Sequence, residues 1–416
     1  MSFSFVSGRT KSARGLASRF ALALALAGGA VIGSAVVAPA AYAQDNSRGF
    51  ANAYSPVAAL VAGEMPNWPA AAAQFETLVA AIENEDDRNI AGNFALQIGS
   101  NTSNPAFQRR GLEMMLQSGK VEPARIGQFN YFVGTLAYQA NDYAASRTAL
   151  QAAIAAGYTQ DDPYGVIMES YIKEGRVDAG LDYLDTLVAG GVALDQNWFL
   201  RSLQQSYDGG LAAESLRAST LLVTHFPGAE NWTKSLQVMN ELAELDGQGQ
   251  LDLLRLMRST QAMTQRSEFV RYIENADPRI MSNEVLSVLA EGLAAEHFTT
   301  GDTYYTEVKA IADTRAPVDR RELEQTVREG QAGTAMDASV AGDVLYSLSD
   351  FARAEMMYQQ ALEKGGDRDT ALTRVGMAQV MQGNYAVAIA TLGQVSGNRQ
   401  PVATLWATWA QEKMGG

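Results

Sequence analysis

Apolar side chains recur along much of the chain at the spacing of one helix face. Between residues 124 and 140 they fall at i, i+3, i+4, i+7 and i+11. This stripe consists of Phe129, Phe132, Val133, Leu136 and Ala140. Such spacing is typical of the buried face of an amphipathic helix. Proline is scarce, with 11 residues in 416, and good helix formers dominate, so the pattern predicts an all-α protein.

The helical stretches are separated by turns that recur every 34 residues. Asp142 lies in one turn and Arg176 lies in the next, 34 positions later. The same interval separates two further pairs, which are Trp198 and Trp232, and Asp350 and Asn384. A fixed period of this length indicates a repeat protein built from short helical units. We therefore expect stacked helical hairpins, each of which buries its second face on the next one.

Three of these units have small or aromatic residues at matching positions. The residues are Gly134, Asn141, Asp142, Tyr143 and Ala153; Gly342, Asp350, Phe351, Ala354, Tyr358 and Ala361; and Gly376, Gly383, Asn384, Tyr385 and Ala388. In these residues the chain resembles the tetratricopeptide repeat (TPR) family, of an exported bacterial type. Two other units differ from the family pattern, at Met168, Gly180 and Glu214. The resemblance implies a right-handed α-solenoid of stacked TPR-like hairpins.

The pattern divides the chain into seven segments. They are a signal peptide (1–43), a disordered lead-in (44–54), an N-terminal helical region (55–122), TPR-like repeats (123–263), degenerate helical hairpins (264–333), two TPR repeats (334–400) and a C-terminal capping helix (401–416). Because proline breaks a helix interior, we expect two charged helices, Glu307–Asp313 and Arg320–Arg328, on either side of Pro317. The acidic run Glu83–Asp87 is expected to be a solvated loop.

The first 43 residues have the pattern of a secretory signal peptide. Four basic side chains and no acidic one accompany an apolar run from Phe20 to Val37, and the small-x-small triplet Ala41-Tyr42-Ala43 follows. This order is typical of a signal that a peptidase removes, here after Ala43. The apolar run is nearly long enough to span a membrane, so an uncleaved anchor is the alternative. We expect a periplasmic protein without stable membrane insertion after cleavage.

The charge of the chain disfavours nucleic acid as a partner. The formal net charge is −14, and the chain after Ala43 has 28 basic and 46 acidic side chains, a net charge of −18. Nucleic-acid binding requires clustered Lys and Arg that neutralise phosphates. An acidic surface instead keeps a protein soluble. We therefore expect no nucleic-acid partner.

The sequence contains no arrangement of residues that predicts an enzyme. It has no Cys, and His225 and His297 stand alone, so they cannot complete a zinc ligand set. Neither a Gly-x-Ser-x-Gly elbow nor a phosphate-binding Gly-x4-Gly-Lys-Ser/Thr loop occurs. Asp367-Arg368-Asp369 lacks the glycine and the distal glutamate of a calcium loop, and is expected to be a turn with a helix N-cap. We expect no catalysis, no metal and no cofactor.

A glycan-active envelope protein is the alternative function. Helical superhelices also occur in lytic transglycosylases, which use a catalytic Glu in a Glu-Ser motif. Glu169-Ser170 matches that motif, but the Gly-Leu-Met-Gln motif that follows it in that family is missing. A glycan-binding or glycan-cleaving helical superhelix is therefore the second hypothesis.

The groove of a tetratricopeptide stack is lined by fixed positions on the first helix of each hairpin. Here these positions include Tyr131, Thr135, Tyr138, Glu169, Lys173, Asp343, Tyr346 and Ser347, which we call the groove residues. The family's Lys and Asn clamp for a terminal carboxylate is missing. Tyrosines in a groove suit peptide or helix binding, and they can equally pack on neighbouring helices. We expect a periplasmic scaffold that binds a protein or peptide in this groove, with cell-envelope assembly as its process.

Overall fold

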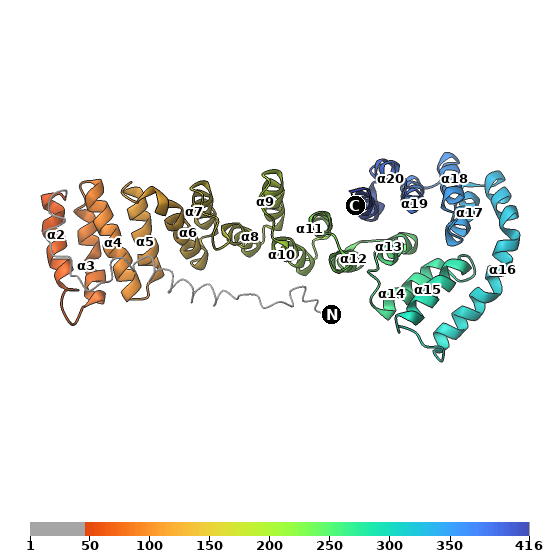
Figure 1. The fold of residues 1–416 in the computed structure, drawn as a ribbon, viewed down its shortest axis with the longest axis horizontal. Coiled ribbons are helices and arrows are strands. Elements are labelled where there is room, and N and C mark those ends of the chain that lie inside the picture. Colours follow the sequence, from red (N-terminus) through yellow and green to blue (C-terminus); the bar gives the residue numbers. More distant parts are fainter. Residues whose placement is uncertain (1–45, 416) are drawn as a thin grey trace. The chain divides into compact units, whose positions relative to one another are not determined.

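The computed structural model describes residues 46–415, and this part of the chain is built from α-helices with one short 3-10 helix and no strand (Figure 1). The expected signal peptide lies outside the described residues. The helices are α2 (Arg48–Ala59), α3 (Trp68–Ala80), α4 (Glu85–Asn101), α5 (Pro105–Gln117), α6 (Pro123–Gln139), α7 (Tyr143–Ala155), α8 (Pro163–Lys173), α9 (Val177–Ala189), α10 (Gln196–Asp208), α11 (Ala212–His225), α12 (Ala229–Leu242), α13 (Gly247–Ser259), α14 (Arg266–Ala276), α15 (Ser282–Ala294), α16 (Thr303–Ala332), α17 (Ala335–Ser347), α18 (Phe351–Glu363), α19 (Arg368–Met381), α20 (Tyr385–Leu392), η1 (Gly397–Arg399) and α21 (Gln400–Gly415). The expected all-α class and stacked hairpins are confirmed.

The described chain divides into two compact units, and the division falls within α9. The N-terminal unit comprises residues 46–186 and the C-terminal unit comprises residues 187–415. In the N-terminal unit, buried apolar side chains form one cluster that runs from Phe50 to Met114 and a second that runs from Leu112 to Ile167. In the C-terminal unit, one continuous cluster runs from Val223 to Ala410. Each unit therefore has its own core.

The 34-residue period corresponds to a repeated turn between the two helices of a hairpin. Asn141 and Ser349 both adopt a left-handed backbone, with φ of 60° and 62°, and each precedes an aspartate that caps the next helix. The amide of Asp142 donates to the carbonyl of Ala137 at 2.9 Å, and Asp350 makes the equivalent bond. These bonds satisfy carbonyl groups at the helix end, as in a Schellman motif. The turn residues seen in the sequence thus set the hairpin geometry.

Small residues allow the two helices of a hairpin to approach each other closely. A Cβ atom added to Gly134 would lie 2.6 Å from Cγ of Leu150, and one added to Gly342 would lie 2.5 Å from Cε1 of Tyr358. Ala354 on α18 is completely buried. Because interiors are close-packed, a larger side chain at these crossings forces the helices apart.

The expected disordered lead-in is wrong, because α2 begins at Arg48. Ser47 caps this helix, and its backbone amide and hydroxyl donate to the Asp87 carboxylate at 3.0 and 2.7 Å. The Phe50 side chain is completely buried. A buried aromatic anchor and a cap fix a segment whose small polar residues suggest disorder when read alone.

The acidic run is likewise not a solvated loop. Glu85, Asp86 and Asp87 form the first turn of α4, where negative charge is favoured by the helix dipole. Asp87 is completely buried, and its carboxylate also accepts a hydrogen bond from the backbone amide of Glu83 at 3.0 Å. The run therefore joins α4 to the start of α2.

Pro317 does not separate two helices, as the sequence led us to expect. It lies inside α16, a single helix of 30 residues. Proline has no amide hydrogen, so the carbonyl of Asp313 loses its helical hydrogen bond, and the ring bends a helix without necessarily ending it. Figure 1 shows that α16 bends on its way from α15 to α17.

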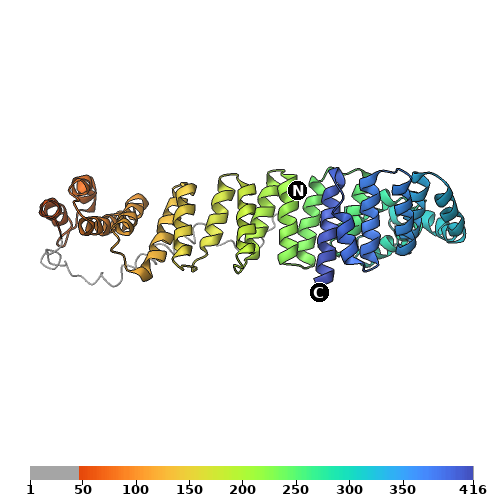
Figure 2. The same cartoon turned by 90° about the horizontal axis from the view of Figure 1, so that it is seen from above.

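The C-terminal helix does more than cover the last hairpin. α21 packs against α19 and α20, as expected of a capping helix, but it also contacts α11 and α13 of the same unit. In Figures 1 and 2 the blue C-terminal helix lies beside green helices of this unit. The helices from α11 to α21 therefore close on themselves as a ring.

Candidate functional site

Five of the eight groove residues are buried. Tyr131, Thr135, Asp343, Tyr346 and Ser347 are between 2% and 8% exposed. A side chain with so little exposed surface cannot supply the contacts that bind a partner in this structure. The expectation that these five line an accessible groove is therefore corrected.

The two buried groove residues of the N-terminal unit bond to their own hairpins. The Tyr131 hydroxyl donates to the carbonyl of Asp161 at 3.0 Å, and its ring centroid lies 5.1 Å from that of Tyr158. The Thr135 hydroxyl donates to the carbonyl of Tyr131 at 2.9 Å. Burial raises the pKa of the Tyr131 phenol. Both side chains therefore serve packing, the alternative that the sequence left open for the tyrosines.

In the C-terminal unit, the buried groove residues belong to an ion network. The Asp343 carboxylate accepts hydrogen bonds from the Tyr358 hydroxyl at 2.8 Å and from Arg374 at 3.0 Å. Burial raises the pKa of Tyr358 well above its usual value. Arg374 also donates to the side chain of Gln248 on α13. The inner face of α17 is thus bonded to α18, α19 and, through Arg374, to α13.

A second part of the network surrounds Arg255 on α13. Its guanidinium lies 4.2 Å from the centroid of the Tyr346 ring and donates to Glu284 at 2.8 and 2.9 Å. The Tyr272 hydroxyl donates to the same carboxylate at 2.5 Å, and the Glu284 amide donates to the Ser347 hydroxyl at 2.9 Å. Burial alone would raise the pKa of Glu284, but the charge and hydrogen bonds of Arg255 hold it below its usual value. This cluster joins α13, α15 and α17.

Asp252 connects the network to the C-terminal end of the chain. Its side chain is completely buried, and it pairs with Arg399 at 2.5 Å, with Arg255 at 3.4 Å and with Arg374 at 3.7 Å. Its backbone carbonyl accepts a hydrogen bond from the Trp406 indole at 2.9 Å. One aspartate is therefore in contact with three arginines from α13, α19 and η1.

The charges of this network balance. Three buried arginines face three buried carboxylates, which are Arg255, Arg374, Arg399, Asp252, Glu284 and Asp343. Charges taken out of water are tolerated only when they are paired and hydrogen-bonded. We name these six residues the closure network. They fill the inner face of the C-terminal unit instead of leaving it open to a ligand.

The remaining groove residues are accessible and lie on the N-terminal unit. Tyr138 on α6 is half-buried, with its ring centroid 5.6 Å from that of Tyr143. On α8, Glu169 is half-buried and Lys173 is exposed, and their charged atoms are 3.9 Å apart. These three side chains can still contact a partner.

Neither histidine lies in a ligand set. The His225 and His297 rings pack on Phe199 and Phe269, at centroid distances of 5.8 and 5.0 Å. Between residues 46 and 415, no three His, Cys, Asp or Glu side chains come together in a way that could hold a metal ion. Asp367 caps α19, as expected. No helix in this part of the chain is long and apolar enough to cross a membrane.

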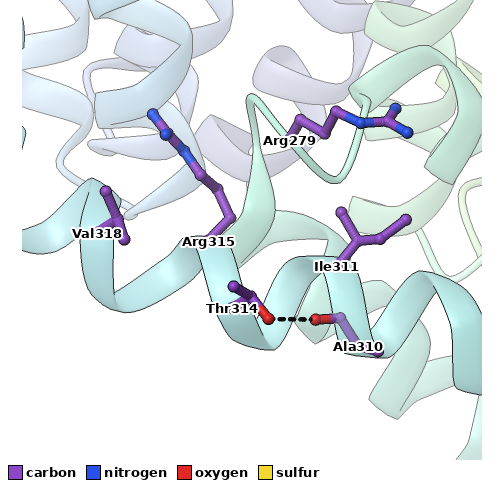
Figure 3. A pocket seen from close by; sticks show the side chains of 6 residues that line it. All are labelled: Arg279, Ala310, Ile311, Thr314, Arg315 and Val318. Carbon is purple, nitrogen blue, oxygen red and sulfur yellow. Dashed lines mark hydrogen bonds between the residues drawn. The ribbon is translucent and has the colours of Figure 1, made fainter.

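An open pocket of about 550 Å³ lies against α16 (Figure 3). Its lining residues are Arg279, Ala310, Ile311, Thr314, Arg315 and Val318. The two arginine side chains point in different directions in Figure 3. Arg315 pairs with Asp319 at 2.6 Å, and Arg279 pairs with Asp277 at 3.5 Å. Each guanidinium group beside this pocket therefore already has a carboxylate partner.

The closure network escaped the sequence analysis. Its signal was a pair of charged residues, Asp252 and Arg255, within the apolar run from Leu251 to Met257. Charged residues in an otherwise buried helix indicate buried ion pairs. The sequence does not show which of the many arginines completes each pair.

Comparison with known proteins identifies no family. No family model and no curated protein sequence matches the chain. Among solved structures 36 chains match, one of them in the structure of Naa15/Naa10 bound to HypK-THB. That alignment has 12% sequence identity and a TM-score of 0.27, and it covers 84% of this chain and 65% of the other. At this TM-score the likeness carries no argument about function, and the helical-repeat architecture is established by the chain's own helices.

Proposed function

We propose that the protein is a periplasmic helical-repeat scaffold that binds a protein or peptide partner, with cell-envelope assembly as its process. Stacked hairpins present long surfaces without a compact reaction site, and such surfaces suit polypeptide partners. We further propose that the N-terminal unit, and not the closed C-terminal unit, provides the binding surface in the form described here.

One observation carries the choice of surface. Equivalent groove positions differ between the two units: Tyr138, Glu169 and Lys173 are accessible on α6 and α8, while Asp343, Tyr346 and Ser347 on α17 are buried. The helices α6 and α8 are in contact, and together their aromatic ring and mixed pair of charges offer both apolar contact and hydrogen bonds to a polypeptide. Tyr138 and Lys173 are therefore the residues to change first.

Export is part of the proposal, and two features support it. The first 43 residues have the composition and order of a cleavable signal. Ser47 follows the expected cleavage site closely, and it is bonded to the buried Asp87. Cleavage after Ala43 would thus release a chain that begins almost directly at its first helix.

Affinity capture from the periplasm tests the proposal. The bait is the chain from Gln44 onward, and the variant combines Tyr138→Ala with Lys173→Glu. The matched control changes a half-buried tyrosine and an ion-paired lysine elsewhere, Tyr207→Ala with Lys309→Glu. We expect a partner that wild type and control capture and that the variant loses. Both double variants should keep the wild-type helical circular dichroism.

Two results would overturn the proposal. Equal capture by variant and control would show that the binding surface does not lie on α6 and α8. Turnover of cell-wall glycans that is abolished by Glu169→Gln would replace the scaffold with the glycan-cleaving alternative. Because the glycan assay needs no protein partner, the two hypotheses are tested separately.

A further inference from the structure

The ring of the C-terminal unit consists of two lobes joined by one helix. The first lobe contains α11 to α15 and the second contains α17 to α21, and α16 is the covalent connection between them. Within the second lobe, α21 packs more extensively on α19 and α20 than on α11 and α13. The contacts of α21 with α11 and α13 therefore close the ring, while those with α19 and α20 hold the lobe together.

The contacts that close the ring include several ion pairs and hydrogen bonds, beside apolar side chains of the same core cluster. Arg399 pairs with Asp252 and, at 3.1 Å, with Asp246. The Trp232 indole donates to the Glu412 carboxylate at 2.6 Å, and these two residues are 180 positions apart. Each of these bonds joins the first lobe to the second. Together with Arg374 and Asp252 they form a seam of charges between the lobes.

A seam that contains buried charges separates more readily than one that is apolar throughout. Burying charges costs hydration, so a buried ion pair adds less net stability than well-packed apolar groups of the same size. When the lobes part, water returns to each charge and repays that cost. The α17–α18 and α19–α20 hairpins are held by buried alanines and a tyrosine. Separating these apolar surfaces exposes them to water and regains no hydration of charges.

The connecting helix provides a hinge. Pro317 removes one helical hydrogen bond near the middle of α16, and a kink of this kind changes its angle at low cost. The Pro317 side chain is exposed, so the proline itself makes no core contact, whereas Ala316 and Asp319 beside it are buried and stay packed on the unit. The bend in α16 and the seam lie in the same unit. A change of the angle at Pro317 would move the two lobes apart at the seam.

We propose that the C-terminal unit is a clamp that opens between its two lobes, with Asp252 as the latch and α16 as the hinge. Opening uncovers the closure network together with Tyr346 and Ser347. Of these residues, the sequence assigned Asp343, Tyr346 and Ser347 to a groove. A molecule that binds only this uncovered face would draw the population toward the open form. The proposal does not depend on whether the N-terminal unit binds a partner.

Distance measurement by paired spin labels tests the clamp on the full chain from Gln44 onward. The chain has no cysteine, so two introduced cysteines can be labelled cleanly. Ala229→Cys on α12 and Gln411→Cys on α21 are exposed positions on opposite sides of the seam. The control pair, Glu363→Cys and Gln411→Cys, lies within the second lobe. The cross-seam distance should show a main short population and a minor longer one.

Asp252→Asn should raise the longer cross-seam population at least tenfold and leave the control pair unchanged. Glu412→Ala, which removes a single contact at the edge of the seam, should raise the longer population by a smaller factor. This milder variant keeps the test valid if Asp252→Asn does not fold. A single short population in both variants would overturn the proposal. So would equal broadening of the cross-seam and control pairs, because that result means unfolding of the lobe and not opening.

Discussion

Asp252 and Arg399 are 147 positions apart in the chain, and they form a buried ion pair at 2.5 Å. Asp252 lies on α13, and Arg399 ends the short η1 helix just before α21. Their contact is one of those that close the row of hairpins into a ring. It also explains why the inner positions of α17 are filled, since the residues around this pair occupy the space that a ligand would need.

Replacing Asp252 by Asn should strongly destabilise the C-terminal unit. The change leaves Arg399 and Arg374 without a full countercharge in a buried position, which costs about 3–5 kcal/mol. Urea unfolding monitored by circular dichroism measures the free energy. Asp313→Asn is the control, because Asp313 pairs with Lys309 at the surface and its loss should cost less than about 1 kcal/mol. Equal effects of the two variants would mean that the closure network contributes no special stability.

Ala354→Arg should be among the most damaging single changes in the second lobe. Ala354 is completely buried on α18, so the new side chain must either carry its charge into the core or separate the helices. Either outcome costs about 3 kcal/mol or more. Ala352→Arg places the same residue on the exposed face of the same helix and should change stability by only about 0.5 kcal/mol. An unchanged melting temperature for Ala354→Arg would refute the repeat register.

The features that were predicted correctly depend on neighbours in the sequence. The turn at Asp142 and the close crossing at Gly342 are fixed by residues within one hairpin, so a 34-residue pattern reveals them. The helical periodicity is local in the same sense. The structure of each hairpin can therefore be predicted from the sequence. The family resemblance alone does not predict that the row of hairpins closes on itself.

The features that were missed depend on distant partners. Ser47 and Asp87 are 40 positions apart. The small polar residues around Ser47 do not indicate that it bonds to a buried carboxylate. Tyr346 fits a groove position by register, but Arg255 from another hairpin covers its ring. Register shows which way a side chain points. It does not show what lies opposite when the chain returns on itself.

Ser47→Ala should loosen α2 from the N-terminal unit. The change removes the helix cap, which is worth about 1 kcal/mol, and leaves the buried Asp87 with one hydrogen-bond donor fewer. Amide hydrogen exchange over residues 48–59 should become faster, while exchange in α6 and α7 stays the same. Ser55→Ala is the control, since the Ser55 hydroxyl is exposed and bonds only within α2. Unchanged exchange in the Ser47 variant would show that the buried Phe50 and Val57 anchor the helix without the cap.

Acid should weaken the C-terminal unit in part through Glu284. Arg255 holds the pKa of this carboxyl below the ordinary value of 4.5. A carboxylate whose pKa is lower in the folded state adds stability above its unfolded pKa, and this contribution is lost as the pH falls through the folded pKa. The loss should therefore begin below about pH 4.5 and increase toward more acid conditions.

Glu284→Gln isolates this contribution. The variant is less stable than wild type at neutral pH, because Arg255 loses its buried countercharge. Its free energy of unfolding should fall less steeply than that of wild type as the pH is lowered, since the carboxylate that must be protonated is gone. Urea unfolding at a series of pH values measures both slopes, and Glu363→Gln on the exposed face of α18 controls for the change in net charge. Parallel curves for wild type and Glu284→Gln would show that acid acts on the unit through other carboxylates. A steeper fall in wild type would identify the Arg255–Glu284 pair as a pH-sensitive part of the closure network.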